Sequence, residues 1–376
     1  MPRTSADCAR RRQRRRTGNV AMMTALMLTL MLGFAALAVD VSNKYRVRTE
    51  SQSAVDAAAL AGARELRGTA QAITTAQAQA RVIGEQHYAY QANVKVPDSD
   101  IMVGRWDANL HDVVAATPAL SNAVKVTHTE PAVAHPFASA LTGTTASTVA
   151  AHAVALGGGP GVAACGFPLA LASCTLEGGA GGNNCGGCMK MASAPQDNVG
   201  WANFDGNTSV PAVSDALKAA CFAADGKTPL LDANGRCLGS CAKQPKAGVD
   251  EMQLGNGNNF TKNPDQFCEM LKSLLRASPT RTVRVQLPVF QSGSAGACNP
   301  QFSGHELAVG FAEVEFLGAK CNKNDPDPVD PGYIPAGCDK AKADHYMIAQ
   351  IMCGTTMDAP GGGGYFGVAA RPVLID

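Results

Sequence analysis

Cysteine is the residue type with the most chemical potential in this chain, which has 13 cysteines among 376 residues. Cys8 lies near the first residue, and the other twelve fall between Cys165 and Cys353. An even number of cysteines in one segment is typical of a disulfide framework in an oxidising compartment. Each bridge that closes a loop of about 15 residues stabilises a fold by roughly 3 kcal/mol in the chain-entropy model. The candidate disulfide cysteines, whose pairing the sequence leaves open, are Cys165, Cys174, Cys185, Cys188, Cys221, Cys237, Cys241, Cys268, Cys298, Cys321, Cys338 and Cys353.

The pair Cys185-Gly-Gly-Cys188 also has the spacing of a redox motif. In a thioredoxin-like site the first thiolate is stabilised at a helix N-terminus. A stretch rich in glycine and asparagine precedes this pair and Met189-Lys-Met191 follows it, so no strand-to-helix context is visible. A periplasmic thiol-disulfide oxidoreductase stays as an alternative. A zinc site would need a second close pair, for which Cys237 and Cys241 are the candidates.

Other motifs of enzyme chemistry are incomplete. His305-Glu306 begins like a metalloprotease motif, but Val309 stands where the second histidine is required. The carboxylates of Asp325, Asp327 and Asp330 are separated by prolines, which is typical of a stiff, solvated turn rather than a calcium loop. The sequence contains neither a Gly-x-Ser-x-Gly elbow nor a Walker loop. We therefore expect no catalytic residue, no cofactor and no metal ion.

An uncharged segment near the N-terminus decides in which compartment these residues lie. From Thr17 to Val39 there is no Asp, Glu, Lys, Arg or Pro. As a helix this segment is about 35 Å long, enough for a hydrocarbon core of about 30 Å. Seven arginines and one acid, Asp7, precede it, which predicts a cytoplasmic N-terminus and an exported remainder.

Two other interpretations of this segment stay open. Ala36-Leu37-Ala38 fits a signal-peptide cleavage site, which would release an exported binding module, although the apolar part of a signal usually has only about 7 to 15 residues. The arginines could form a nucleic-acid arm, but they carry no aromatic residues between them. Without the tail's seven arginines and Asp7, 25 basic and 30 acidic residues remain, so nucleic acid is not expected as a partner.

The segment from Val41 to Arg67 contains no Pro and only one Gly, so the helix should continue beyond the membrane as a rod. The small residues Ala54, Ala57, Ala58 and Ala61 form a candidate helix-packing face. They could receive a partner or simply pack on a second helix expected from Thr69 to Tyr90.

Three pieces of this region carry a family resemblance: Arg16-Thr-Gly-Asn-Val-Ala21, Ala38-Val-Asp40 and the run from Gln52 to Ala61. At this spacing they resemble the N-terminal module of TadE/TadG-like proteins of the tight-adherence (Flp) pilus assembly system. The pieces "VGRWDAN", "NAVKVTHTEPA" and "STVAAHAVAL" look like the second block of the same family. The resemblance implies an inner-membrane protein with one span and a periplasmic domain.

Downstream, alternation predicts strands around residues 101–106, 123–128 and 147–156, with a short helix at 136–141. Gly157-Gly-Gly-Pro-Gly161 is interpreted as a linker, and Gly361–Gly364 as a surface loop. The distal half should contain a helix starting at Asn263-Pro264 and strands around Val283–Val289, Leu307–Phe311 and Met347–Cys353. A phase shift between Phe311 and Val314 suggests a bulge.

The predicted fold class is α+β, a transmembrane helix and helical rod followed by a small α+β domain and a disulfide-rich distal domain with an antiparallel sheet. The expected domains are a basic cytoplasmic tail (1–16), the transmembrane helix (17–39), a periplasmic domain (40–156), a linker (157–161) and the cysteine-rich domain (162–376). We predict a non-enzymatic, single-pass inner-membrane component of pilus assembly. Its expected partners are the lipid bilayer and other pilus assembly proteins or pilins.

Overall fold

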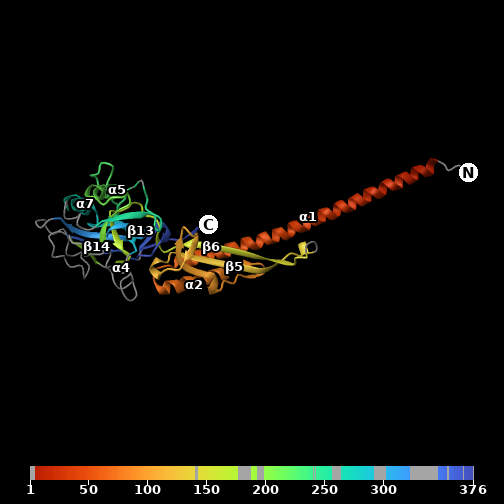
Figure 1. Cartoon of the computed structure of the whole chain (residues 1–376), viewed down its shortest axis with the longest axis horizontal. Helices are drawn as coiled ribbons and strands as arrows, with labels where there is room; N and C mark the ends of the chain where they lie inside the picture. Colours follow the sequence, from red (N-terminus) through yellow and green to blue (C-terminus); the bar gives the residue numbers. More distant parts are fainter. Residues whose placement is uncertain are drawn as a thin grey trace.

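One long helix, α1 (Ser5–Arg64), runs from the N-terminal region into the folded body of the protein (Figure 1). The computed structural model describes residues 5–139, 143–176, 188–192, 199–239, 241, 243–255, 264–291, 302–321, 346–353, 355–366 and 368–375. No proline interrupts α1, so its backbone hydrogen bonds continue from the apolar segment into the rod. The predicted continuous helix is therefore confirmed.

Helix α2 (Ala70–Glu85) folds back on α1 after Gly68. Its first turn is capped by Thr69, whose side-chain oxygen accepts a hydrogen bond of 3.1 Å from the backbone N–H of Ala72. The two helices meet on small residues: a Cβ at Gly62 would lie 3.2 Å from Ala80 Cβ, and one at Gly84 would lie 3.4 Å from Ala58 Cβ. The helix predicted from Thr69 to Tyr90 is confirmed with a shorter C-terminal end.

A five-stranded antiparallel sheet packs against α1 and α2. Its centre is a long hairpin, in which Ala123 pairs with Leu156 at one end and Ala134 with Ala146 at the other. In Figure 1 this hairpin extends beside α1 toward the N-terminal side. In sheet order, the strands are β17 (Val373–Ile375), β6 (Ala146–Leu156), β5 (Ala123–Ala134), β3 (Ile101–Asp107) and β4 (Asp112–Val114). Shorter elements near this sheet are β1 (Tyr88–Ala89), β2 (Ala92–Asn93), η1 (Asp98–Asp100) and η2 (Pro118–Leu120).

The distal domain contains a seven-stranded sheet covered on one face by two helices, α5 (Val210–Cys221) and α7 (Pro264–Ala277). Phe267, Leu271 and Leu274 of α7 are buried against this face, as their helical spacing predicts. A short helix, α4 (Ser173–Leu176), follows the third strand. In sheet order, the strands are β11 (Glu251–Gly255), β10 (Val199–Asn203), β8 (Leu169–Ala172), β12 (Val283–Phe290), β13 (Gly304–Lys320), β14 (Tyr346–Ile351) and β9 (Cys188–Ala192).

The predicted bulge between Phe311 and Val314 is wrong. Strands β12 and β13 keep an unbroken register there, and their irregularity lies at Phe290, opposite the step from Gly310 to Ala308. The alternation fails because all residues from Gly310 to Val314 are buried. A strand covered on both faces no longer shows a polar side in its sequence.

The two glycine segments expected to be a linker and a surface loop are instead packed against each other. Gly159–Pro160 forms strand β7, which pairs with β15 (Thr355–Gly363), and β15 pairs in turn with β16 (Val368–Arg371). Residues 157–161 are buried, and the N–H of Gly362 donates to the carbonyl of Gly157 at 3.1 Å. Glycine fits here because it permits close backbone approach. We call segments 157–161 and 361–364 together the glycine junction.

The last strand changes the predicted domain boundaries. We expected residues 162–376 to form one distal unit, but Val373–Ile375 pair with Val154–Leu156 in the N-terminal sheet. The distal domain is therefore inserted between β6 and β17, and both of its connections pass the glycine junction. The α+β class with mostly antiparallel sheets is confirmed, and the parallel pairs are β8–β12 and β15–β16.

We expect Gly157→Ala to destabilise the protein, because the added Cβ would lie 2.1 Å from the carbonyl oxygen of Ala63 at the end of α1. Neither backbone can move freely there, so we expect the free energy of unfolding to fall by about 3 kcal/mol, at the upper end of the usual cost of overpacking. Thermal unfolding followed by circular dichroism in detergent measures the loss. Gly33→Ala is the matched control, since nothing lies within 4 Å of its added Cβ. Equal melting temperatures for the two variants would contradict the tight junction.

Candidate functional site

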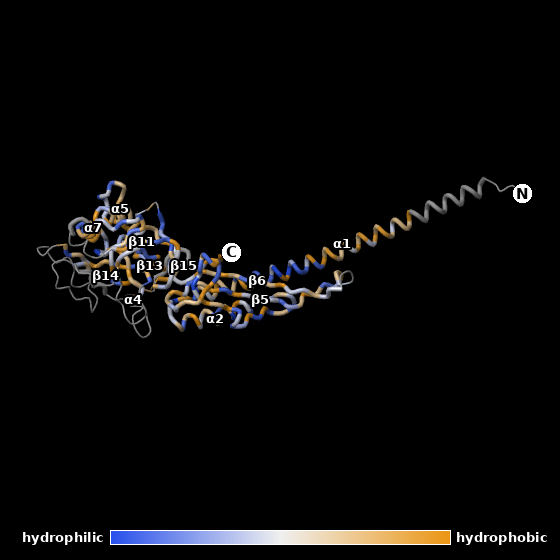
Figure 2. Tube along the Cα trace, in the orientation of Figure 1, coloured by the Kyte–Doolittle hydropathy of each residue, from blue (hydrophilic) through white to orange (hydrophobic). Residues whose placement is uncertain are grey.

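The first candidate site is the exposed apolar part of α1. Between Val20 and Val39 the large apolar side chains are exposed, with Phe34 at 71% and Leu26 at 58%. Figure 2 shows this stretch as hydrophobic along its length, followed by a hydrophilic stretch. Within the described residues, one helix, from Val20 to Arg64, is long and apolar enough to cross a membrane by length and composition. Its 18-residue window of mean hydropathy 2.2 is not covered by the protein itself.

Asp40 marks the end of this stretch and is only 3% exposed. Its carboxylate accepts hydrogen bonds from the backbone N–H groups of Phe137, at 3.1 Å, and Ala138. These groups lie in the turn between β5 and β6, where the N–H of Ser139 donates to the carbonyl of His135. A carboxylate at the first N–H groups of a helical turn acts as a cap. Asp40 therefore holds the tip of the hairpin against α1.

Further contacts fasten the same hairpin along the rod. Val47 of α1 is buried against Val133 and Val149, one from each strand. Tyr90 joins them: its N–H donates to Glu50 at 3.3 Å, and its hydroxyl accepts from Ala134 at 2.9 Å. The hairpin is thus tied to α1 from Asp40 to Glu50 by polar and apolar contacts. The β5–β6 turn lies beside the last residues of the apolar stretch.

The predicted helix-packing face divides into two parts. Ala54 and Ala58 are fully buried in the core that α1 forms with α2 and the sheet. Ala57 and Ala61 are partly exposed and continue a line from the exposed Ser53. Of the two alternatives for this face, the burial of Ala54 and Ala58 agrees with internal packing.

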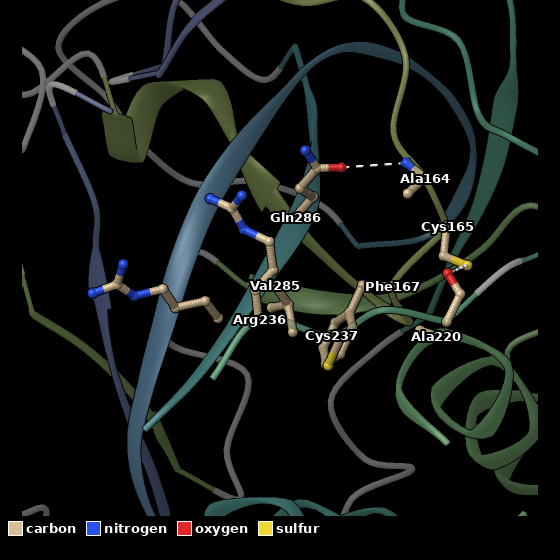
Figure 3. A pocket seen from close by; sticks show the side chains of 10 residues that line it. Ala164, Cys165, Phe167, Ala220, Arg236, Cys237, Val285 and Gln286 are labelled. Carbon is tan, nitrogen blue, oxygen red and sulfur yellow. Dashed lines mark hydrogen bonds between the residues drawn. The ribbon is translucent and has the colours of Figure 1, made fainter. Parts of the chain in front are cut away.

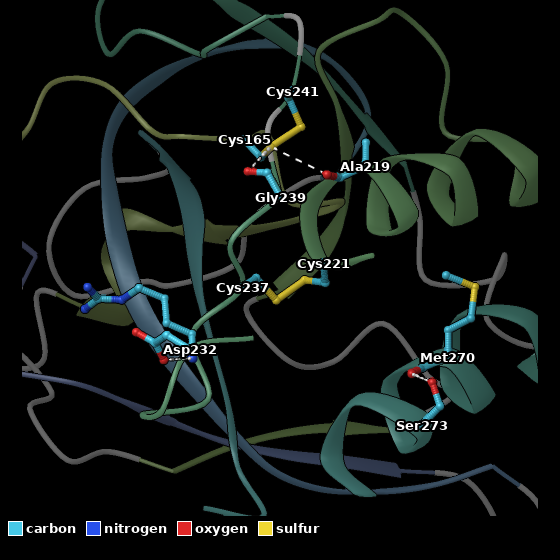
Figure 4. The surroundings of a disulfide bond; sticks show 10 residues. Cys165, Ala219, Cys221, Asp232, Cys237, Gly239, Cys241, Met270 and Ser273 are labelled. Carbon is cyan, nitrogen blue, oxygen red and sulfur yellow. Dashed lines mark hydrogen bonds between the residues drawn. A yellow bond between two sulfur atoms is a disulfide. The ribbon is translucent and has the colours of Figure 1, made fainter. Parts of the chain in front are cut away.

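The disulfide framework of the distal half is visible in three described bonds, of which Figure 4 shows two. Cys165–Cys241 ties the segment after the glycine junction to a loop, Cys221–Cys237 ties the end of α5 to the same region, and Cys268–Cys321 ties α7 to the end of β13. Sequence separations of 16, 53 and 76 correspond to about 3, 4 and 4.5 kcal/mol in the chain-entropy model. Cys174 and Cys353 are also disulfide-bonded.

Three of the candidate cysteines, Cys185, Cys298 and Cys338, lie outside the described residues, as do the acidic loop from Asp325 to Asp330 and the cap at Asn263. The backbone at Cys188 opens strand β9, which pairs with β14. A helix N-terminus would be needed to stabilise a thiolate in a thioredoxin-like site. The strand gives the C-x-x-C pair no such helix on its C-terminal side.

A small pocket of about 90 Å³ lies beside Cys165 and is lined by Arg236, Arg284 and Gln286 (Figure 3). Its charged groups are already partnered. Arg236 Nε donates to the buried Glu313 at 3.1 Å, and Arg284 Nε donates to Glu315 at 3.0 Å. Gln286 accepts from the N–H of Ala164 at 3.3 Å. The contacts of Arg236 and Gln286 bind loops to the sheet, and the contact of Arg284 joins strands β12 and β13.

Two exposed aspartates have lowered pKa values for local reasons. The Thr228 hydroxyl, which donates at 2.5 Å, and the N–H groups of Thr228 and Lys227 lower the pKa of Asp225 to about 2. The Lys125 ammonium group, at 2.7 Å, and the N–H of Val113 lower the pKa of Asp112. These hydrogen bonds stabilise a turn at Asp225 and a strand end at Asp112. They account for the lowered pKa values without a catalytic role.

The metalloprotease-like pair His305-Glu306 lies in β13, opposite Gln253 and Met252 of β11. A strand places neighbouring side chains on opposite faces, so this pair cannot ligate one ion together. Among the described residues, no group of three or more His, Cys, Asp or Glu is arranged to hold a metal ion.

Sequence reasoning missed Asn122, which connects the N-terminal sheet with the glycine junction. Its side chain is buried, accepts from the N–H of Trp106 at 2.8 Å and donates to the carbonyl of Gly362 at 2.5 Å. Its backbone carbonyl accepts from Gly157 at 2.8 Å. An asparagine directly before the Ala123–Ala134 strand is the only trace of this role in the sequence, and it resembles an ordinary strand boundary.

We expect Asp40→Ala to lower the free energy of local opening of the β5–β6 turn by about 1 to 2 kcal/mol, the usual cost of losing a helix cap. The N–H groups of Phe137 and Ala138 lose their acceptor, so their amide hydrogens should exchange faster. Hydrogen exchange with mass spectrometry measures this. Asn43→Ala is the control, because Asn43 contacts only Arg46 of the same helix among the described hydrogen bonds. Unchanged exchange at the tip would contradict the capping role of Asp40.

Two family models match the region that contains this site. Residues 18–65, the apolar stretch and the rod, match the Tad family of TadE/G-like Flp pilus-assembly proteins, and residues 61–155, which reach the end of β6, match the Tad-like Flp pilus-assembly family Tad_C. No curated protein and no solved structure matches the chain. Over residues 18–155 the chain thus carries two matched domains of Flp pilus-assembly families, one TadE/G-like and one Tad-like.

Proposed function

We propose that this protein is a membrane-anchored, non-enzymatic component of Flp pilus assembly that acts through protein contacts on the periplasmic side of the inner membrane. One observation carries the proposal: the uncovered apolar part of α1 continues without a break into the buried core of the matched domain. A stretch this apolar is stable when lipid surrounds it. The anchor and the first domain thus share one helix.

The charge distribution supports the orientation. Seven arginines precede the apolar stretch, and the positive-inside tendency places them in the cytoplasm. All described disulfides lie on the other side of the stretch, in agreement with an oxidising compartment. Helical structure through Ala38 and the contacts of Asp40 favour an uncleaved anchor over a released binding module.

Counting free thiols in the purified full-length protein tests this arrangement. The protein is taken from the membrane fraction, denatured without reductant, alkylated with a maleimide and analysed by mass spectrometry. We expect one labelled cysteine, Cys8, because it lies on the cytoplasmic side and the twelve others on the oxidising side.

A polypeptide that begins after Ala38 and carries no label would support signal cleavage instead. Labels on Cys185 and Cys188 that appear and disappear with added oxidant would support the thiol oxidoreductase. Recovery from the cytosol with the distal cysteines labelled would overturn the whole proposal.

The exposed line of α1 is the contact surface that we propose for other assembly proteins. Ala57 and Ala61 are partly exposed along this line, and small side chains permit close approach of another helix. Ala54 and Ala58 are buried in the core that α1 forms with α2 and the sheet, so they fix the orientation of this exposed line.

Replacing both alanines, Ala57→Gln and Ala61→Gln, should reduce co-purification with pilins and assembly proteins several-fold, since the longer side chains prevent close packing but keep the helix. Thr75→Gln on the exposed side of α2 is the matched control. Equal co-purification of both variants, with equal melting temperatures, would remove this surface from the proposal.

A further inference from the structure

We infer that the described start of the β5–β6 turn, residues 135–139, is a second membrane contact, in which Phe137 enters the outer interface of the bilayer that α1 crosses. The inference rests on the proposed anchoring of α1 and extends it to a segment distant in sequence. Phe137, three residues after the end of β5, is 48% exposed. Its backbone N–H lies 3.1 Å from the carboxylate of Asp40.

The position of the tip follows from α1. Val39 is the last residue of the uncharged stretch, so Asp40 lies at the level where the helix leaves the hydrocarbon region. Phe137 and Ala138 are hydrogen-bonded to this residue, and the hairpin points toward the N-terminal side of the rod (Figure 1). The turn is therefore held at the height of the interface.

The hairpin is fixed in this position. Val47, Val133 and Val149 form a small buried cluster between the rod and both strands, about 10 Å along α1 from Asp40. The polar groups of His135, in the described part of the turn, are paired within the protein: Nε2 lies 2.7 Å from Ser147 Oγ, and the N–H donates to the carbonyl of Thr145 at 2.8 Å. Placing the turn in the interface thus leaves these groups paired.

Its composition distinguishes this turn from the β3–β4 turn, which also exposes a large apolar side chain. No Asp, Glu, Lys or Arg occurs between Glu130 and Glu177, so no formal charge must leave water when the tip approaches lipid. The β3–β4 turn exposes Leu110 to 67%, yet Asp107 and Asp112 flank it. That turn lies beyond the opposite end of β5, a strand of 12 residues that is itself about 36 Å long.

A bilayer explains these features better than a protein partner does. The anchor supplies a lipid surface at the level of the tip in every copy, whereas a protein would have to be recruited there. A second point of contact also restricts the tilt and rotation of α1, which a single helix leaves free.

Tryptophan fluorescence in lipid nanodiscs tests the inference on the full chain. Phe137→Trp, Phe34→Trp and Leu110→Trp each add one indole to the two native tryptophans, and the wild-type emission is subtracted. The nanodiscs contain phosphatidylcholine with bromine atoms, which quench nearby indoles, either near the headgroups or near the chain ends. We expect the added indole of Phe137→Trp to emit at shorter wavelength than that of Leu110→Trp. Its emission should be quenched by bromine near the headgroups, because indole prefers the interface. Phe34→Trp should be quenched by the deeper bromines and Leu110→Trp by neither.

Emission from Phe137→Trp that resembles Leu110→Trp, while Phe34→Trp is quenched, would overturn the second contact and leave the anchor intact. Emission that shifts only when other assembly proteins are added would assign the tip to a protein partner and would also overturn the inference. No quenching of Phe34→Trp would contradict the anchor itself. A change in the melting temperature of Phe137→Trp is controlled with Phe137→Ser, which should fold normally because the side chain is exposed.

Discussion

Helix α1 carries apolar side chains in two different surroundings along one axis. Its first half is uncovered by protein from Val20 to Val39, and its second half is the centre of the N-terminal core. Because the backbone hydrogen bonds of a helix are internal, the same structure satisfies its polar groups in lipid and in a protein interior. The rest of the N-terminal domain forms around this helix: α2 contacts it through small residues, and the sheet closes over both.

Asp40 lies where the two surroundings meet. A buried carboxylate is costly unless hydrogen bonds compensate it, and here two backbone N–H groups of a distant turn do so. The position of the hairpin is thereby connected to the end of the apolar stretch.

The sequence predicts the local features well where one cause dominates. Absence of charge and proline identifies α1, helical spacing identifies the buried face of α7, and alternation identifies β12. It predicts poorly where two causes produce the same residues. Glycine at 157–161 is equally typical of a flexible linker and of tight backbone packing, and only the opposite segment at 361–364 distinguishes them. Likewise, Ala57 and Ala58 are the same residue type, but Ala57 is partly exposed and Ala58 is buried. The difference depends on which face of α1 is covered by α2, which the two residues themselves do not reveal.

The insertion of the distal domain has a mechanical consequence. The distal domain is connected to the N-terminal sheet by two segments of the chain, one after β6 and one before β17. Both segments meet the sheet at the same edge. A force on the distal domain is thus shared by these two connecting segments. Hydrogen bonds between β7 and β15 join the two segments to each other. A domain attached by one strand can swivel about it, whereas this one resists torsion. Tension on the distal domain would therefore reach the N-terminal sheet, and the helix α1 beneath it, through both connections.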